Sequence, residues 1–561
     1  MQRIIVIGGL SAGPSAAAKA RRENESAEII LFEKTANISY ATCGIPYALS
    51  GHIPTRDKLI VVDAQLLRDR FNIQVRLNEA VTDIDPEKKI VTTPLGQYEY
   101  DTLVFATGAT TFVPPVAHLQ EADNWAPCRS LEDFDHISKN ALTDEVKHIT
   151  VMGAGLIGIE VAENLRHSGK KVTVIEGAPQ ILPMWQPKFS AFAQNVLENH
   201  GIEVIKSTFV KSVEVADGRI THIDLGEGRL LPTDFVIMSV GIKPNTALLT
   251  SKGAAAIGNG ALIVNERFET SLPGIYAAGD NVSIKNLITG QQDYLPLGTH
   301  SNKGGRAAGH NAAGGSEYLN GGYKTAIIQV FDHTLARTGL GPRDLEKAGI
   351  PFEKSLIVAN ATPGYYPHPT DIIVETYYRK DDYTLLGAEV FGQVGVDKRI
   401  DVLSTAIYAK LKMTDLPQLD LAYAPPYAPA KDPVVVNGYA ATNALFNGYR
   451  EISAEDLHDA ILAGEDLQIV DVRHLDEREH LGKIPTAQWV ELEGMRQHLN
   501  DMDPHRKTVV YCAKGLRGYV AYKMLQHAGF KDVWNLAGGF KVWHEYERQY
   551  PVFQEGELEL S

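Results

Sequence analysis

Gly8-Gly9-Leu10-Ser11-Ala12-Gly13 is the stretch that decides the fold of the N-terminal part of the chain. It lies between the apolar segment Arg3–Ile7 and an alanine-rich segment, an order that predicts a β-strand, a tight turn and an α-helix. Backbone N–H groups of such a turn, together with the helix N-terminus, can face a pyrophosphate. Glu33 lies twenty residues after Gly13, at the end of the next predicted strand, where a carboxylate can accept a hydrogen bond from a ribose hydroxyl. The stretch predicts a dinucleotide-binding unit, although Leu10 stands where a second glycine is usual.

A second and cleaner copy of this pattern follows the predicted strand Ile149–Met152. Gly153-Ala154-Gly155-Leu156-Ile157-Gly158 matches G-x-G-x-x-G, and Val172–Glu176 is the next predicted strand. Two copies predict two dinucleotides, one flavin and one nicotinamide. Glu176 would repel a 2′-phosphate, and residues 177–179 supply no arginine to bind one, so the sequence favours NADH over NADPH.

Composition and charge exclude several other classes of protein. A chain of 561 residues predicts three or four domains. A net charge of −15 argues against nucleic acid or an anionic membrane as the main partner. No apolar run approaches the ~20 residues of a membrane span, and the chain enters a predicted strand at Arg3, which leaves no room for a signal peptide. Three cysteines indicate reduced thiols in a cytoplasmic protein rather than a disulfide framework. We expect no metal site.

Cys43 lies at the centre of Ser39-Tyr40-Ala41-Thr42-Cys43-Gly44-Ile45-Pro46-Tyr47-Ala48, shortly after the predicted strand that ends near Glu33. This stretch resembles the redox-active segment of the pyridine nucleotide-disulfide oxidoreductases. The thiol-disulfide members place a second cysteine five positions after the first, where this chain has Ala48. The resemblance is therefore to the single-cysteine branch, and most closely to the coenzyme A-disulfide reductases. It implies that the Cys43 thiolate is the nucleophile, and we expect its position beside the flavin and near a helix start to favour ionisation.

Two further segments support the flavin assignment. Asp101–Gly108 and Thr270–Asp280 resemble the elements that close an FAD site, and the aspartate of the second is expected to accept from the ribityl chain. Gly304–Gly309 is expected to open a helix near the isoalloxazine ring. Cys128 matches no motif and is expected to be structural.

The resemblance assigns binding roles to three groups of residues. For FAD these are Gly8, Gly9, Ser11, Ala12, Gly13, Glu33, Lys34, Ala106, Thr107, Gly108, Gly279, Asp280 and Tyr423. For NADH they are Gly153, Gly155, Leu156, Ile157, Gly158, Glu176 and Gly241. For coenzyme A they are Ser15, Lys19, Arg22, Ser39, Thr42, Cys43, Phe71, Asn302 and Lys431. Lys19, Arg22 and Lys431 would supply the positive charge that phosphates need.

From about residue 323 the pattern changes to alternating apolar and polar residues, as in Asp371–Tyr378. This part resembles the α+β interface domain of the coenzyme A-disulfide reductases and ends in the distinctive stretch Asp420–Pro433. In that family the interface domain joins two subunits, and one of its tyrosines reaches the active cysteine of the partner. The resemblance implies a homodimer, with Tyr423 as this tyrosine and Tyr365 as the second. The alternative interpretation is that both tyrosines only pack.

The C-terminal part resembles a rhodanese domain, from Asp471-Val472-Arg473 to Gly538-Gly539-Phe540. Cys512 leaves a predicted buried strand into the loop Cys512–Gly518, which leads into a helix. Backbone N–H groups and Arg517 are expected to surround the sulfur, lower the pKa of the thiol and stabilise a persulfide. Gly482-Lys483 replaces the usual Gly-His of the family.

The sequence thus predicts an α/β protein with two Rossmann-like domains, an α+β dimerisation domain and an α/β rhodanese domain. The expected boundaries are 1–111 and 245–322 for the FAD-binding domain, 112–244 for the NAD-binding domain, 323–445 for the interface domain and 446–561 for the rhodanese domain.

The combination implies an FAD-dependent NADH reductase of persulfides, polysulfides or coenzyme A disulfides, with Cys43 as redox nucleophile and Cys512 as carrier of sulfane sulfur. Two alternatives remain. An NADH oxidase or peroxidase would cycle Cys43 through a sulfenic acid, but such relatives carry a histidine in the first glycine loop, where this chain has Ser11. A non-reductive sulfur carrier would leave the flavin and nicotinamide motifs without a task.

Overall fold

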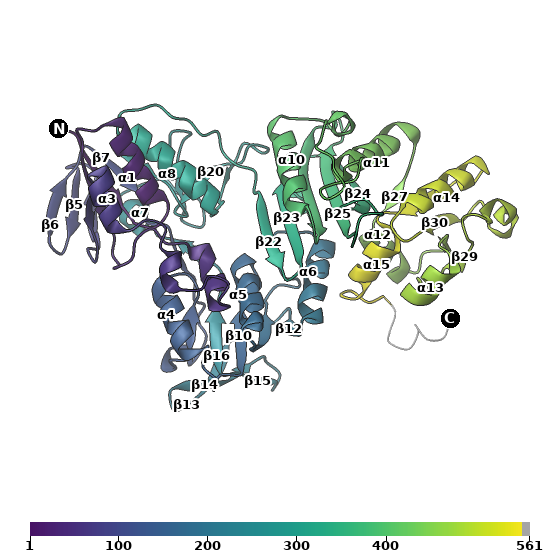
Figure 1. Ribbon diagram of the computed structural model, residues 1–561, viewed down its shortest axis with the longest axis horizontal. Coiled ribbons are helices and arrows are strands. Elements are labelled where there is room, and N and C mark those ends of the chain that lie inside the picture. Colours follow the sequence, from purple (N-terminus) through teal and green to yellow (C-terminus); the bar gives the residue numbers. More distant parts are fainter. Residues whose placement is uncertain (553–561) are drawn as a thin grey trace. The chain divides into compact units, whose positions relative to one another are not determined.

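The computed structural model describes residues 1–552 and divides the chain into two units. Unit 1 comprises Met1–Pro179 and Gly201–Lys324, and unit 2 comprises Gln180–His200 and the chain from Thr325 onward. Figure 1 labels many of the helices and strands of both units. Residues 180–200 lie inside the stretch expected to bind NAD, yet they belong to unit 2.

The first sheet of unit 1 is parallel throughout and has the strand order β19-β7-β1-β2-β3. Its strands are β1 (Arg3–Ile7), β2 (Glu28–Phe32), β3 (Gln74–Arg76), β7 (Thr102–Phe105) and β19 (Ile275–Ala277). The central strands are almost wholly apolar and buried, as expected for a sheet covered on both faces. The turn between β1 and α1 (Ala12–Glu23) therefore lies at the carboxyl edge, where ligands of open α/β sheets bind.

Helix α8 (Gly298–Ala312) packs closely against α1. A Cβ atom at Gly305 would lie 2.3 Å from the Ala12 carbonyl oxygen, and one at Gly309 would lie 2.1 Å from the Ala16 oxygen. The expectation that Gly304–Gly309 opens a helix is wrong, because the helix begins at Gly298. These glycines lie inside the helix and allow the two helix backbones to touch.

The second sheet of unit 1 repeats this arrangement with the strand order β12-β11-β10-β16-β9. Its strands are β9 (Trp125–Pro127), β10 (His148–Met152), β11 (Lys171–Ile175), β12 (Ile202–Ile205) and β16 (Phe235–Met238). Helix α5 (Leu156–His167) follows β10 and packs on the sheet. The two glycine-rich turns thus occupy equivalent positions in two parallel sheets.

Unit 2 contains one antiparallel and one parallel sheet. The antiparallel sheet has the order β22-β23-β26-β25-β24 and is formed by Ala326–Val330, His333–Gly339, Leu385–Gly392, Asp371–Arg379 and Phe352–Asn360. Helices α10 (Val396–Tyr408) and α11 (Pro433–Asn447) pack on it, and α6 (Pro187–Asn199) contacts its first two strands and β26. This is the α+β pattern expected from residue 323 onward.

The parallel sheet of unit 2 has the order β27-β31-β30-β28-β29. Its strands are β27 (Glu451–Ile452), β28 (Leu467–Asp471), β29 (Gln488–Trp489), β30 (Lys507–Tyr511) and β31 (Val533–Leu536). Its helices are α12 (Ala454–Leu462), α13 (Leu475–Leu481), α14 (Leu516–His527) and α15 (Gly539–Glu547). The loop that starts at Cys512 follows the central strand β30.

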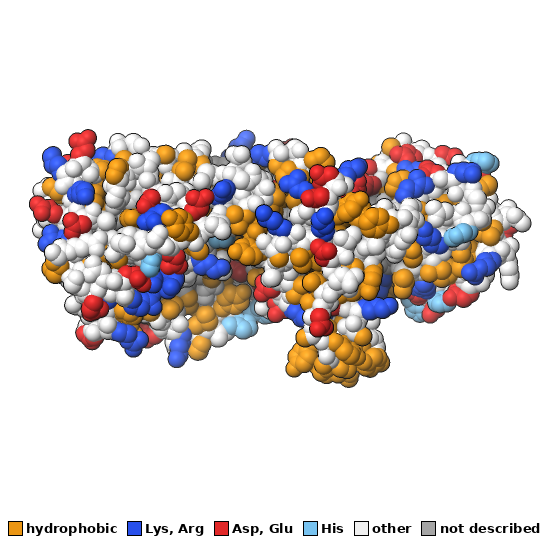
Figure 2. Space-filling model, turned by 90° about the horizontal axis from the view of Figure 1, so that it is seen from above, with side chains coloured by type: hydrophobic (Ala, Val, Ile, Leu, Met, Phe, Trp, Pro, Cys, Tyr) orange, Lys and Arg blue, Asp and Glu red, His pale blue; other side chains and the backbone are white. Residues whose placement is uncertain are grey.

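Charged side chains of both signs are interspersed on the face shown in Figure 2, and no broad basic surface is visible there. Among residues 1–552, no helix combines the length and the apolar composition that a membrane crossing requires.

Candidate active sites

The first glycine-rich turn has a backbone that only glycine tolerates. Gly8 has a φ of +105°, and a Cβ atom there would lie 2.1 Å from the Ala106 carbonyl oxygen. The Gly9 N–H donates to Glu33 Oε2 over 2.8 Å, while the Thr35 N–H donates to Glu33 Oε1 over 2.9 Å. Glu33 therefore fixes the turn as well as presenting a carboxylate at the carboxyl edge of the sheet.

The second turn is built in the same way. Gly153 has a φ of +101°, and the Ala154 N–H donates to Glu176 Oε2 over 2.7 Å. Glu176 Oε1 accepts from the Ala178 N–H over 2.8 Å. A Cβ atom at Gly155 would meet nothing within 4 Å, so the space in front of this turn is open to a ligand backbone or phosphate. The repeat seen in the sequence thus extends to the hydrogen bonds of the two glutamates, and both turns fit the dinucleotides expected there.

The other residues assigned to the nucleotides flank these turns. The Thr107 hydroxyl donates to the Asn245 carbonyl oxygen over 2.6 Å, and Asn245 Nδ2 donates to the Thr107 carbonyl oxygen. Gly108 and Gly241 have positive φ, and a Cβ atom at either would meet nothing within 4 Å. Lys34 is exposed. Gly108 follows β7 of the first sheet and Gly241 follows β16 of the second, so each sheet has open space beside one of these glycines.

Asp280 follows Gly279 after β19 and is held by an arginine that the sequence analysis did not single out. Arg129 Nη2 lies 2.6 Å from Asp280 Oδ2, and the Ser301 hydroxyl donates to Oδ1 over 3.1 Å. Arg129 also donates to the Ala109 carbonyl oxygen. The neighbouring Cys128 is buried, and burial raises the pKa of its thiol, as suits a structural residue.

Cys43 lies in a short 3₁₀ helix, η1 (Thr42–Gly44), directly before α2 (Ile45–Leu49), which packs against α5. Part of its surface is exposed. Desolvation by surrounding protein atoms raises the pKa of the Cys43 thiol, the Glu160 carboxylate raises it further, and a hydrogen bond with Thr42 lowers it. In the protein alone, desolvation and the Glu160 carboxylate outweigh any effect of the five-residue helix α2 on this pKa, and the ionisation expected beside the flavin stays a prediction.

Glu160 is a second residue that the sequence analysis missed. It lies on α5, two positions after Gly158. Desolvation and the neighbouring Glu163 raise its pKa to about 7, against a hydrogen bond with Tyr47 that lowers it. The sequence signal available for Glu160 was a glutamate within the mostly apolar segment that follows the second glycine-rich turn. The group can hold or release a proton near neutral pH beside the Cys43 sulfur.

Most residues assigned to coenzyme A lie in unit 1. Ser15, Lys19 and Arg22 follow the helical spacing that places them on one face of α1. The Ser15 hydroxyl donates to the Asn302 carbonyl oxygen over 3.3 Å. The charge of Lys19 is paired with Glu23, which also contacts His310. Arg22 is exposed and donates from Nε to the Ala18 carbonyl oxygen.

The remaining coenzyme A candidates are less uniform. Ser39 is buried with a φ of +46°, and its N–H donates to the Gly9 carbonyl oxygen, so it lies beside the first glycine-rich turn. Phe71 ends α3 (Ala64–Phe71) and packs against the core. Lys431 is exposed and belongs to unit 2. The structure therefore does not gather all of these candidates within one unit.

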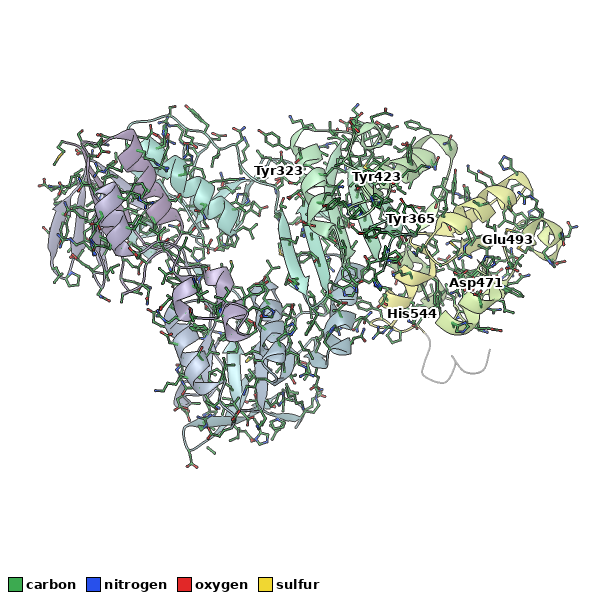
Figure 3. All side chains as sticks on the ribbon, in the orientation of Figure 1. Tyr323, Tyr365, Tyr423, Asp471, Glu493 and His544 are labelled. Carbon is green, nitrogen blue, oxygen red and sulfur yellow. The ribbon has the colours of Figure 1, made fainter. Side chains whose placement is uncertain are left out.

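Tyr365 and Tyr423 also belong to unit 2 and are adjacent, with their hydroxyl oxygens 3.2 Å apart (Figure 3). Tyr365 is 74% exposed and Tyr423 is 51% exposed. The hydrogen bond with Tyr423 raises the pKa of the Tyr365 phenol. The two tyrosines therefore lie on the surface of unit 2 and do not belong to the hydrophobic core of their own chain.

Cys512 is buried, with 2% of its surface exposed, where β30 ends. The Gly515 N–H points at Cys512 Sγ over 3.1 Å, and the Phe540 N–H donates to the Cys512 carbonyl oxygen over 2.8 Å. Gly539 allows this close approach, since a Cβ atom there would lie 2.3 Å from the same oxygen. Arg517, on the first turn of α14, binds Glu477 of α13 through two contacts of 2.6 Å. The loop thus presents a backbone donor and a guanidinium around one sulfur.

A buried ion pair supports this loop. Arg473 Nη2 lies 2.7 Å from Asp471 Oδ2, and both side chains are fully buried. Asp471 is labelled in Figure 3. Arg473 also donates to the Gly482 carbonyl oxygen, and the Tyr511 hydroxyl donates to Asp471. The Asp471-Val472-Arg473 motif therefore fixes the loop at Gly482, where Lys483 replaces the usual histidine.

The loop of Cys512 is also tied to the antiparallel sheet. Lys514 Nζ donates to Asp371 Oδ1 over 2.6 Å and to Asn360 Oδ1 over 3.0 Å, and Lys541 contacts the other oxygen of Asp371. Burial raises the pKa of Asp371, but the two lysines more than offset this and leave it below its ordinary value. Asn360 and Asp371 are the cross-strand pair that brackets the segment 361–370, which carries Tyr365.

Two family models match the chain. Residues 2–294 match the pyridine nucleotide-disulphide oxidoreductase family, and residues 453–546 match the rhodanese-like domain. These matches confirm both resemblances and the α/β fold class expected from the sequence.

Several known proteins are similar over most of this chain. A protein of Methanocaldococcus jannaschii named NADH oxidase is 32% identical over 79% of this chain and all of its own length. A protein of Pyrococcus horikoshii named NAD(P)H coenzyme A polysulfide/persulfide reductase is 31% identical over 78% of this chain and 97% of its own.

Two solved structures include the C-terminal domain. Reduced CoADR-RHD of Bacillus anthracis has a TM-score of 0.92 and 35% identity, with 98% of each chain covered. An NAD-dependent persulfide reductase of A. fulgidus has a TM-score of 0.91 and 33% identity, covering 97% of this chain and all of its own.

Proposed function

Because the chain belongs to the pyridine nucleotide-disulphide oxidoreductase family and ends in a rhodanese-like domain, we propose that it reduces persulfides and polysulfides with NADH. Coenzyme A disulfide is a further proposed substrate, and sulfide is the proposed product from sulfane sulfur. The observation that carries the proposal is the occurrence, in one chain, of Cys43 near two dinucleotide turns and Cys512 in a rhodanese loop. Similar proteins named for coenzyme A and persulfide reduction support it.

The residues around the first turn are those we propose for FAD, and those around the second turn are proposed for NADH. When bound, FAD carries the electron pair of NADH to a sulfur–sulfur bond. Gly8, Gly9, Glu33 and Asp280 would hold the flavin nucleotide, and Gly153, Gly155 and Glu176 would hold the nicotinamide nucleotide. Glu176 disfavours a 2′-phosphate, which supports NADH as the donor.

The chemistry proposed for Cys43 is that of a thiolate nucleophile. The thiolate attacks the sulfane sulfur of a persulfide, the carrier thiolate leaves, and Cys43 retains the sulfur as a persulfide until two electrons release it as sulfide. Glu160 lies close enough to affect the proton of this thiol. Because its pKa is about 7, it can exchange that proton at neutral pH.

We further propose a cytoplasmic homodimer in which the tyrosine pair Tyr365 and Tyr423 of the partner subunit lies over Cys43. The exposure of both tyrosines supports an intermolecular role, since their hydroxyls bond to each other at the surface of their own chain. In this arrangement a phenol can protonate the departing thiolate. The coenzyme A residues named above would then hold the carrier, with Lys431 supplying part of the positive charge.

The proposal is tested by anaerobic NADH oxidation with coenzyme A persulfide, glutathione persulfide, polysulfide and coenzyme A disulfide, with sulfide measured. Cys43→Ser should abolish turnover with every acceptor, while the flavin stays bound and reducible by NADH. Cys512→Ser is the matched control, because it removes the other reactive thiol and should leave diffusible acceptors at least partly reducible. Turnover retained by Cys43→Ser would overturn the assignment.

An NADH oxidase is the second candidate, because a similar archaeal protein bears that name. In that reaction Cys43 would be oxidised to a sulfenic acid and reduced again. Ser11, in place of the histidine of such relatives, weighs against it. Oxygen or hydrogen peroxide consumption that exceeds persulfide reduction would favour this candidate. A non-reductive sulfur carrier would instead show sulfur transfer at Cys512 without NADH consumption by any sulfur acceptor.

A further inference from the structure

The Arg517 guanidinium, which interacts with the Cys512 thiol, is already paired with a carboxylate. Arg517 and Glu477 form a two-point ion pair, with Nη1 and Nη2 each 2.6 Å from a carboxylate oxygen. Two parallel bonds of this kind are stronger and more directional than a single charge contact. The neutral backbone N–H of Gly515 is then the donor that faces the sulfur without a counter-charge.

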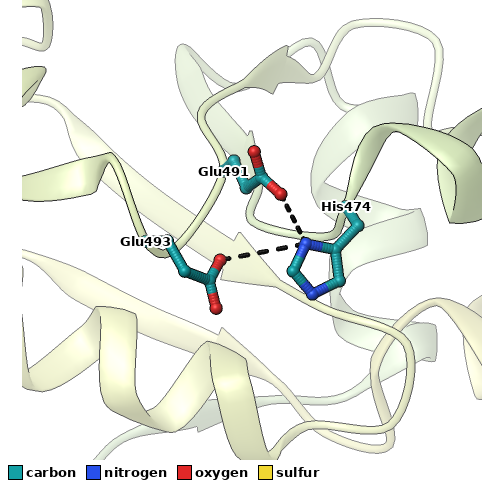
Figure 4. Close-up of side chains that lie close together, drawn as sticks. All are labelled: His474, Glu491 and Glu493. Atoms are coloured by element: carbon teal, nitrogen blue, oxygen red, sulfur yellow. Dashed lines mark hydrogen bonds and ion pairs between the residues drawn. The ribbon is translucent and has the colours of Figure 1, made fainter.

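More carboxylates lie beside this pair. The His474 N–H donates to Glu477 Oε2 over 3.3 Å, and its imidazole Nδ1 contacts Glu491 and lies 3.9 Å from Glu493 (Figure 4). The hydrogen bond with Glu491 raises the pKa of His474, while the charge of Arg517 lowers it, so the guanidinium is close. Glu477 thus binds the arginine, and Glu491 and Glu493 contact the histidine. These five groups carry a net negative charge whether the histidine is protonated or not.

The second cation of the loop points to another partner. Lys514 is held by Asp371 and Asn360 of the antiparallel sheet, and Asp371 also binds Lys541. Arg517 and Lys514, the two cations of the loop Cys512–Gly518, are therefore each bound to a carboxylate, and Lys514 shares its carboxylate with Lys541.

We propose that the Cys512 site accepts sulfane sulfur from persulfides that bring little negative charge, and that Glu477 makes it discriminate against thiosulfate. This inference rests on the proposed sulfur chemistry of Cys512. The thiolate attacks the outer sulfur of R–S–SH, a new S–S bond forms, the old one breaks, and R–S⁻ leaves with its electron pair. The proton stays on the transferred sulfur. With thiosulfate the same attack must release sulfite, a dianion, at a site whose arginine is paired with Glu477 and whose neighbouring histidine contacts two more carboxylates. Like charges close together are costly.

The test compares sulfur transfer to cyanide by the full-length holoenzyme, with thiocyanate measured, from cysteine persulfide and from thiosulfate. Cys512→Ser gives the background. We expect wild-type kcat/KM to be higher for the persulfide by about tenfold or more. Glu477→Gln should lower the ratio of kcat/KM for the persulfide to kcat/KM for thiosulfate by about tenfold, mainly by raising the value for thiosulfate. Added salt should raise kcat/KM for thiosulfate in the wild type, because it screens the repulsion between thiosulfate and the carboxylates. The same salt should have less effect on Glu477→Gln.

Two further variants separate charge from structure. Glu479→Gln removes the same charge from α13, two residues further along, and should leave the ratio within about twofold. The double variant Glu491→Gln/Glu493→Gln removes two carboxylates and leaves the Arg517–Glu477 ion pair in place. It should also lower the persulfide-to-thiosulfate ratio, which keeps the test valid if Glu477→Gln folds poorly.

Wild-type preference for thiosulfate, or equal effects of Glu477→Gln and Glu479→Gln, would overturn the inference. NADH-dependent sulfide release at Cys43, measured on the same preparations, reports separately on the proposed function.

Discussion

The thiol of Cys43 and the carboxylate of Glu160 influence each other's ionisation. The carboxylate is among the causes that raise the pKa of Cys43, and burial together with Glu163 brings the pKa of Glu160 to about 7. A nucleophile with a raised pKa is a smaller fraction thiolate at neutral pH, so its reactivity depends on the protonation of its neighbour.

Glu160→Gln is expected to lower the pKa of Cys43, because it removes a negative charge that opposes the thiolate. The measurement is the pH dependence of Cys43 alkylation in the holoenzyme, followed by mass spectrometry of the Cys43 peptide. Glu163→Gln is the control on the same helix. It removes a charge that raises the pKa of Glu160, so Glu160 ionises more readily and the pKa of Cys43 should rise instead. A shift in the same direction for both variants would contradict this account.

At this scale the sequence predicted residues whose role depends on their own backbone or motif. Gly8 and Gly153 lie where their positive φ is needed, and Glu33 and Glu176 bind the turns they follow. Arg129 was not predicted, because its contact with Asp280 joins positions 151 residues apart and neither neighbours a motif of the other. The contribution of Glu160 to the pKa of Cys43 was not predicted for a related reason, since Glu160 lies on a different helix.

Among the elements, strands β25 and β26 place two glutamates opposite each other in the middle of the antiparallel sheet. Glu375 and Glu389 are cross-strand partners, and each side chain is 1% exposed. Like charges at such positions destabilise a sheet. The structure resolves this by giving the two glutamates different partners. Lys188 of α6 lies 2.9 Å from Glu375 and also binds Glu455 of α12. Burial raises the pKa of Glu389 to about 7, against the charge of Arg337.

Glu389→Gln is expected to stabilise unit 2 above neutral pH. A carboxyl whose pKa rises from 4.5 to about 7 on folding binds its proton more tightly in the folded state. Its stabilising contribution is therefore full below about pH 4.5 and is lost as the pH rises through about 7. Glutamine does not ionise, so the variant avoids this loss of folding free energy, which for such a rise in pKa is roughly 3 kcal/mol. The free energies of unfolding of the wild type and of Glu389→Gln, measured with denaturant at several pH values between about 5 and about 8, give the comparison.

Glu375→Gln is the matched control on the facing strand. It removes a partner of the buried Lys188 and should lower the free energy of unfolding by on the order of 3 kcal/mol. Equal effects of the two variants at pH 8 would show that the two glutamates do not differ in charge.

Element types followed from periodicity and from the order of motifs, whereas helix limits and contacts did not. Gly304–Gly309 was predicted to begin a helix, but these glycines lie inside α8 and let it touch α1. That reason lies on another helix, so the segment alone could not reveal it. The same holds for α6, which the sequence assigns to the NAD-binding stretch although Lys188 packs among acids of unit 2.

For the whole molecule, the sequence predicted the order of the parts because each part carries its own motif. It did not predict how the rhodanese-like domain joins the antiparallel sheet, since Lys514 and Asp371 are 143 residues apart. Asp371 and Asn360 bracket the segment 361–370, so one lysine of the Cys512 loop holds both ends of the segment that carries Tyr365. The position of the tyrosine pair is therefore linked to the Cys512 loop.

Tyr423→Phe tests the proposed assembly together with the chemistry. If the hydroxyl of Tyr423 protonates the departing thiolate at Cys43 of the other subunit, its loss should lower kcat by about 10²–10⁴-fold. The flavin spectrum should change little, because the phenyl ring remains. Tyr365 keeps its own hydroxyl in this variant but loses the bond to Tyr423. A fall in kcat with unchanged KM would separate acid assistance from binding.

Mixed dimers of Tyr423→Phe and Cys43→Ser subunits decide which chain supplies the tyrosine. If the tyrosine acts across the dimer, each mixed dimer holds one site with Cys43 and Tyr423 intact and one site with both defects. Activity should then return to about half of the wild type per dimer, well above either parent. If the tyrosine acts within its own chain, every site in the mixed dimer carries one defect and no activity returns. Affinity tags of two kinds, purified in sequence, ensure that the dimers measured are mixed, so the absence of recovery would refute the proposed intersubunit site.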